Sequence, residues 1–229
     1  MRASALALVL AGIVLAGCGG HGKSAGSNGE ASKSADKVLA DAKAAADSAS
    51  SARVSGNIVS GGTPIKLDLS MGSGQAKGSM STSGLSFDLI RIGNTAYIKG
   101  SDDFYKHFAG AAVAQLLHGK WLKASIVRGR FRSLRPLTSI DLLFAKVSSG
   151  HGKLVNDGKT SYKGRQVVAI RDASDSSKLY VAATGKPYPV ALVGGTKGQS
   201  GTISFGDWNK SVPLSAPKDA IDISQLGAG

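Results

Sequence analysis

Apolar and polar side chains alternate strictly through residues 65–71, and this pattern constrains the fold more than any other. Successive side chains of a β-strand point to opposite faces of the sheet, so the segment predicts a strand with one apolar and one wet face. Similar short segments recur, separated by turns rich in glycine. The expected strands cover residues 53–60, 64–71, 75–81, 85–92, 95–99, 121–123, 152–156, 162–171, 178–183, 189–196, 201–205 and 221–223.

Three stretches have helical spacing of their apolar residues. An alanine-rich helix is expected over 34–51, a second helix over 102–117 and a third over 136–147. The order is therefore helix, strands, two helices, strands. Because strands and helices do not alternate, a doubly wound parallel sheet is disfavoured. We predict an α+β fold, with one large curved antiparallel sheet and the helices collected on one of its faces.

The N-terminus has the pattern of a secretion signal. Arg2 precedes an apolar run over residues 5–16, and small residues lead up to Cys18, which is the single cysteine of the chain. The run is shorter than the ~20 residues that a membrane span needs. With one cysteine no disulfide can form within the chain, so the folded domain must be stabilised by its core.

Leu15-Ala16-Gly17-Cys18 resembles the lipobox of bacterial lipoproteins. The resemblance implies that the chain is cut before Cys18, that residues 1–17 are lost, and that a diacylglyceryl group on Cys18 anchors the protein to the outer face of the cell membrane. The alternatives are a buried, unmodified thiol and an ordinary signal peptide that happens to contain cysteine. Residues 18–35 then comprise the lipidated cysteine and a flexible polar tether, and residues 36–229 form the domain.

The chain is strongly basic, with 28 Lys and Arg against 15 Asp and Glu, a formal charge of +13. A basic exported protein is attracted to anionic headgroups or cell-wall polyanions, whereas export argues against a nucleic-acid partner. Four arginines lie close together, and an extended segment would place most of them on one face. They form a candidate headgroup or membrane patch: Arg128, Arg130, Arg132 and Arg135. The alternative is a solvated loop whose arginines pair with scattered acids.

The histidines do not suggest catalysis. His21, His107, His118 and His151 are not spaced as metal ligands, and the sequence has no Gly-x-Ser-x-Gly nucleophile motif. Asp172 and Asp175 flank a polar turn. We therefore expect a protein that is not an enzyme and that has no cofactor and no metal.

Several segments resemble the LolA-like lipoproteins, in particular the LppX/LprG-type lipoproteins of actinobacteria. These segments are residues 93–100, 121–123, 179–190, 203–209 and 212–217, and their order matches from about residue 34 to residue 223. The resemblance implies a half-open antiparallel barrel wrapped around helices, with an apolar cavity for acyl chains.

We expect this cavity to be lined by apolar residues of the sheet and of the capping helix: Leu67, Leu69, Phe87, Leu89, Tyr97, Leu137, Ile140, Leu143 and Phe144. The expected function is to bind a lipid, glycolipid or lipidated molecule for transport or presentation in the cell envelope, as a monomer. The 136–147 helix and the arginine segment before it are candidates for a movable lid. The alternative is a filled core, in a structural, interaction or sensor lipoprotein.

Overall fold

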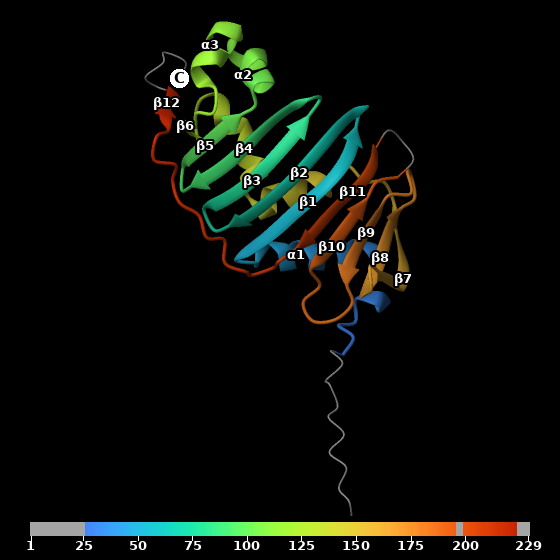
Figure 1. The fold of residues 1–229 in the computed structure, drawn as a ribbon. Helices are drawn as coiled ribbons and strands as arrows, with labels where there is room; N and C mark the ends of the chain where they lie inside the picture. Colours follow the sequence, from blue (N-terminus) through green and yellow to red (C-terminus); the bar gives the residue numbers. More distant parts are fainter. Residues whose placement is uncertain (1–25, 196–198, 224–229) are drawn as a thin grey trace, which may run out of the picture.

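A computed structural model describes residues 26–195 and 199–223, and twelve strands of this part form one sheet (Figure 1). The strands are β1 Ser51–Ser60, β2 Thr63–Gly72, β3 Gln75–Thr82, β4 Leu85–Ile92, β5 Thr95–Gly100, β6 Leu122–Ser125, β7 Leu154–Tyr162, β8 Arg165–Asp172, β9 Lys178–Ala182, β10 Pro189–Val193, β11 Gln199–Gly206 and β12 Ile221–Asp222. Their order in the sheet is β12-β6-β5-β4-β3-β2-β1-β11-β10-β9-β8-β7. All neighbours are antiparallel except β12, which runs parallel to β6.

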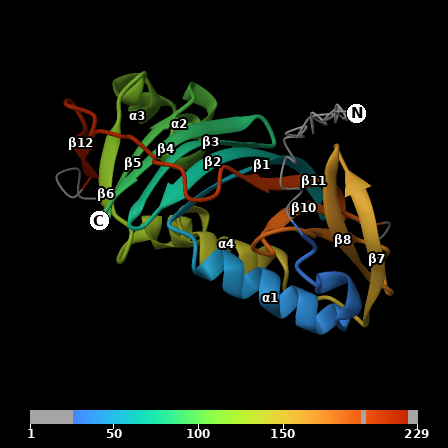
Figure 2. The same ribbon diagram turned by 90° about the horizontal axis from the view of Figure 1, so that it is seen from below.

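The helices are η1 Glu30–Ser32, α1 Ala35–Asp47, α2 Asp102–Ala109, α3 Ala111–Leu117, η2 Arg130–Thr138 and α4 Ile140–Val147, where η denotes a 3₁₀ helix. The sheet curves around α1 and α4, which lie on its inner face (Figure 2). In contrast, α2 and α3 stand beyond the end of β5 (Figure 1). The expected α+β fold with one large curved sheet is confirmed, but the helices are not all collected on one face.

Alternation along the strands supplies the inner face of the sheet. Leu67, Leu69 and Met71 are buried, while the residues between them are more exposed. On the opposite side of the core, α1 contributes mainly small side chains, among them the fully buried Ala42. Small side chains let the helix approach the sheet closely. Phe144 of α4 adds a large buried ring to this layer, and the ring meets that of Phe205 edge to face at 5.6 Å.

Glycines on the inner face permit the curvature of the sheet. Gly78 of β3 has a φ of +151°, and a Cβ there would overlap the backbone of Asp68 and lie 2.8 Å from Cα of Leu69. Gly201 of β11, with a φ of +99°, packs as closely against β1. Glycine within a strand typically marks such a bend or close backbone approach. The concave shape of the inner face therefore depends on the lack of a side chain at these two glycines.

Gly78→Ala is expected to lower the free energy of unfolding by about 1–3 kcal/mol, because the added methyl group cannot be accommodated without moving the neighbouring strand. Gly206→Ala is the matched control, since it lies in β11 with nothing within 4 Å of an added Cβ. Urea denaturation of both variants measures the difference. Equal stability of the two would contradict this account of the curvature.

Two expected helices have different boundaries. The 102–117 helix is broken at Gly110, whose φ of 85° and ψ of 161° end α2 and start α3. The 136–147 helix begins as the C-terminal part of η2, and α4 starts only at Ile140. The strands expected over 152–156 and 162–171 are the hairpin β7–β8, whose turn follows Tyr162. Within the described residues, no helix is both long enough and apolar enough to span a bilayer.

Candidate functional site

A cleft of about 520 Å³ opens between the helix layer and one end of the sheet. It lies where β8 turns into β9 and where α4 leads into β7. Its walls come from α1, α4, β1, β2, β7, β8, β10 and β11. The lining residues are Leu39, Ile58, Val59, Ile65, Lys146, Ser148, Ser149, Gly150, His151, Leu154, Ile170, Asp172, Asp175, Ser177, Leu192, Gly194, Ser200 and Ile203.

The inner wall of the cleft is aliphatic. Five of its large side chains pack against the main core yet are only partly buried, because they also face the cleft: Leu39, Ile58, Ile65, Leu154 and Leu192. The rim carries polar and charged groups, including Lys146, His151 and Asp175. The cleft is thus apolar inside and polar at its mouth, which is the usual composition of a small-molecule site.

Asp172 fastens two loops of the rim together. Its carboxylate accepts hydrogen bonds from the backbone N–H of Gly152 at 2.7 Å and from the backbone N–H and hydroxyl of Ser174, each at 2.7 Å. The bonds from Ser174, and then that from Gly152, lower the pKa of the Asp172 carboxyl below its ordinary value. The charged carboxylate therefore ties the loop before β7 to the turn after β8.

The stability that Asp172 contributes should depend on pH. Because its pKa is lower in the folded than in the unfolded protein, the contribution is complete above the unfolded value of about 3.9 and is lost as the pH falls through the folded pKa. We expect Asp172→Asn to be less stable than the parent at pH 7 and to approach it in stability below pH 4. Urea midpoints at both pH values measure this, with the exposed Asp219→Asn as control. A difference that persists unchanged at low pH would contradict the assignment.

The segment expected to act as a lid is held at the joint between η2 and α4. The guanidinium of Arg91, on the inner face of β4, donates to the carbonyl oxygen of Thr138 at 3.0 Å and to that of Gly93 at 2.8 Å. Burial and the nearby Arg135 lower the pKa of Arg91. The sequence analysis did not single out Arg91. Its signal was a charged residue at a position that continues the inner-face alternation of Phe87 and Leu89.

The arginine segment forms the 3₁₀ helix η2 and not an extended strand. With three residues per turn, Arg132 and Arg135 project from the same side, and both are exposed. Arg128 lies before η2 and lines a separate hollow of about 430 Å³, beside the ion pair of Lys123 and Asp222 at 3.2 Å. The side chain of Arg130 lies outside the described part. The alternate spacing therefore does not create the single face that was expected.

The structure does not bring the sequence-predicted cavity residues to the cleft. Six belong to the main core or pack against it: Leu67, Leu69, Leu137, Ile140, Leu143 and Phe144. Phe87 and Leu89 belong to a second apolar cluster. Tyr97 alternates with the buried Ala96 and Ile98, so it lies on the outer face of the sheet. None of the nine lines the cleft.

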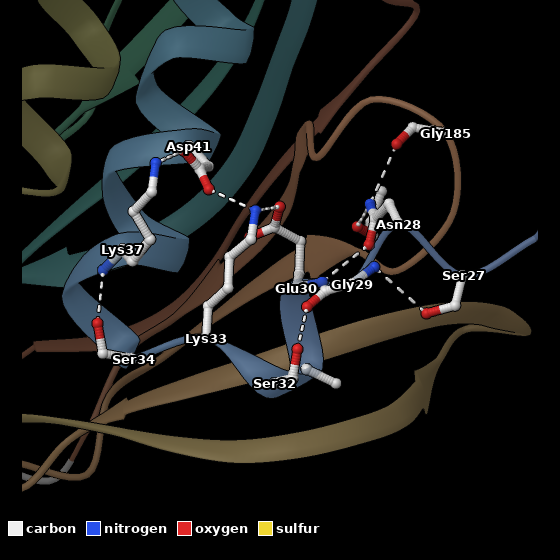
Figure 3. A network of polar contacts seen from close by, with 12 residues as sticks. Ser27, Asn28, Gly29, Glu30, Ser32, Lys33, Ser34, Lys37, Asp41 and Gly185 are labelled. Carbon is white, nitrogen blue, oxygen red and sulfur yellow. Dashed lines mark hydrogen bonds and ion pairs between the residues drawn. The ribbon is translucent and has the colours of Figure 1, made fainter.

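The chain is fixed to the sheet well before α1 (Figure 3). Ser27 forms a β-bridge with Thr184. Asn28 donates its backbone N–H to the carbonyl oxygen of Ala183 at 3.0 Å, and its side-chain amide donates to that of Gly185 at 3.1 Å. These contacts hold the start of the described chain against the turn between β9 and β10.

A chain of ion pairs continues this attachment (Figure 3). Glu30, only 2% exposed, pairs with Lys33 at 2.7 Å, and Lys33 pairs with Asp41 of α1 at 2.7 Å. Hydrogen bonds from Lys33 and then Lys37 lower the pKa of Asp41. Residues 27–34 thus belong to the folded domain, which corrects the tether expected over 18–35. Cys18 lies outside the described residues.

Comparisons with known proteins find structural likeness only. No family model and no curated protein matches the sequence. Among solved structures, LprF from Mycobacterium bovis is 13% identical, with a TM-score of 0.52 over 81% of this chain and 97% of that one. The lipoprotein LppX from Mycobacterium tuberculosis is 16% identical, with a TM-score of 0.50 over 79% and 99%. The chain therefore has the fold expected from its resemblance to the LppX/LprG-type lipoproteins.

Proposed function

We propose that this protein is a membrane-anchored carrier that binds a lipid or lipidated molecule through an acyl chain in the cleft. The observation that carries the proposal is the wall of partly buried aliphatic side chains at the end of the sheet. A soluble domain normally buries such side chains against its own core. Here they surround a space that the described residues do not fill, in a fold shared with the lipoprotein LppX.

The size of the cleft suits one acyl chain. Taking the ~30 Å³ of a water molecule as the room for one heavy atom, about 520 Å³ holds on the order of 17 heavy atoms. Each methylene group transferred from water into such a space contributes about 0.8 kcal/mol. The polar rim then holds the headgroup at the mouth, where Lys146, His151 and Asp175 offer charges of both signs.

The mechanism is partition and needs no catalytic group. The described residues contain no cluster of three or more His, Cys, Asp or Glu that could hold a metal ion. The acyl chain of the ligand enters when α4 moves away from α1, and it leaves by the same route. The Arg91 contact with Thr138 holds the N-terminal end of this lid, so we expect the C-terminal end, at Lys146 and Ser148, to move first.

The anchor sets where the carrier works. Lipidation of Cys18 would leave nine residue steps before Ser27, which is fixed to the sheet. At ~3.3–3.6 Å per residue, that connection reaches at most about 30–32 Å. The domain would therefore stay within reach of the outer face of the membrane.

Charge placed in the cleft should abolish ligand binding without unfolding the protein. For the double variant Leu154→Arg with Leu192→Arg we expect binding of a fluorescent fatty acid to weaken at least tenfold, which is a loss of about 1.4 kcal/mol or more in the free energy of binding. The reason is that the charged guanidinium groups would lie beside the acyl chain. Leu142→Arg, on α4 and 38% exposed, is the matched control. Titrations of the purified protein, with native mass spectrometry for co-purified lipid, measure the effect. Binding equal to that of the parent would rule out the cleft as the site.

The sequence-predicted cavity residues should behave as core. Leu69→Ala removes a side chain that is 1% exposed, so we expect a loss of about 2–5 kcal/mol in the free energy of unfolding, with fatty-acid affinity within twofold of the parent. Denaturation and the same titration test both. A large loss of affinity with unchanged stability would instead place the ligand at the centre of the sheet. Absence of any acyl ligand in all variants would favour the alternative of a filled core.

The arginine segment is proposed to contact anionic headgroups. Replacement of Arg128, Arg130, Arg132 and Arg135 by Gln is expected to weaken binding to anionic vesicles by up to ~1 kcal/mol per charge, and less at high salt. Co-sedimentation at two salt concentrations measures this. Arg53→Gln is the control, because this arginine is already paired with Asp68 on the outer side of the sheet. Unchanged vesicle binding would remove the patch from the proposal.

A further inference from the structure

The helical hairpin formed by α2 and α3 exposes an apolar surface. Phe108 is 60% exposed, Leu116 75% and Val113 39%. From residue 108 to residue 117 the only polar side chain is Gln115. The hairpin projects beyond the end of β5 (Figure 1). We call its three exposed apolar side chains the tip.

The hairpin is held firmly from below, so its exposed face is not the result of loose packing. Tyr105 is 1% exposed, and its hydroxyl accepts from the N–H of Gly100 and donates to the carbonyl oxygen of Lys120, both at 2.9 Å. Ala114 and Leu117 are buried against the start of β6. The hairpin therefore carries large apolar side chains on its exposed side as well as on its buried side, which is unusual for a surface that faces only water.

The tip belongs to a strongly basic protein, whose formal charge is +13. Lys106 and Lys120 flank the apolar stretch in the sequence. The two acids at the start of α2 are partnered, Asp102 with His118 at 2.7 Å and Asp103 with Lys106 at 3.3 Å. An apolar tip on a basic protein is complementary to an anionic lipid surface, whose interior accepts apolar side chains and whose headgroups attract cations.

We propose that the α2–α3 hairpin inserts its tip, Phe108, Val113 and Leu116, into a lipid surface that contains anionic headgroups. The contact is distinct from the anchor. The β9–β10 turn that holds Asn28 and the β5 strand that leads into the hairpin are separated by seven strand spacings, or about 34 Å along the sheet. The domain would therefore touch lipid at two well-separated points.

The test places an environment-sensitive fluorophore at the tip. In the full chain with Cys18→Ser, single cysteines are introduced by Phe108→Cys, Leu116→Cys and, as the matched control, Leu142→Cys, which is 38% exposed and lies on α4, outside both the hairpin and the arginine segment. Each is labelled with a nitrobenzoxadiazole group. Vesicles of phosphatidylcholine alone, and with one third phosphatidylglycerol, are then added at two salt concentrations.

We expect a blue shift of the emission and at least a twofold rise in intensity at positions 108 and 116 with the anionic vesicles, with little change at position 142. In unlabelled protein, Phe108→Ser with Leu116→Ser should lower affinity for the same vesicles at least fivefold relative to Leu142→Ser. Equal shifts at all three positions would indicate general adsorption and overturn the proposal. So would no shift at the tip, or a shift that depends on protein concentration without vesicles, which would indicate self-association.

Discussion

The structure depends on how an open sheet covers its apolar inner face. Twelve strands bring a continuous band of aliphatic side chains to that face, and only α1, η2 and α4 are available to cover it. The alanines of α1 cover the inner face by letting the helix pack closely on the sheet, and Phe144 of α4 covers it with a large side chain. Between these helices and the end of the sheet where β8 turns into β9, the cleft remains open. The cleft is the part of the inner face that the helices leave uncovered, so core packing and the candidate site have the same physical origin.

Alternation in the sequence identified the inner face but not the position of the cleft along it. Leu67 and Leu69 have the same pattern as Ile65, yet they lie in the middle of β2, beneath the helices, while Ile65 lies near its end. Ile58 of β1 is paired with Ile65 and is likewise near a strand end. Coverage by a helix is a property of the tertiary packing. A sequence pattern with a period of two cannot report it.

Composition does not predict structure where local contacts oppose the general trend. Residues 27–34 are polar and contain glycine and serine, as a linker does, but Asn28 completes the backbone hydrogen bonds of the β9–β10 turn, and Lys33 connects two acids. The arginine segment has the spacing of a strand, but it follows Gly129 at a φ of 69° and continues as a 3₁₀ helix up to Thr138. Gly110 did carry a readable signal. A glycine inside a helical pattern commonly marks a break, and here it separates α2 from α3.

The directions of the strands constrain how a tethered carrier could exchange its ligand. Strand β9 begins next to Ser177 at the rim of the cleft and ends next to Ala183, where Asn28 is attached. The mouth and the start of the tether thus lie at opposite ends of a five-residue strand, about 17 Å apart. If the strands were perpendicular to the membrane, with the tether on the membrane side, the mouth of the cleft would face away from the anchoring membrane. Exchange of ligand with that membrane would require the domain to tilt toward the surface. Lipid contact at the α2–α3 hairpin, at the far end of the sheet from the tether, would stabilise the tilted orientation.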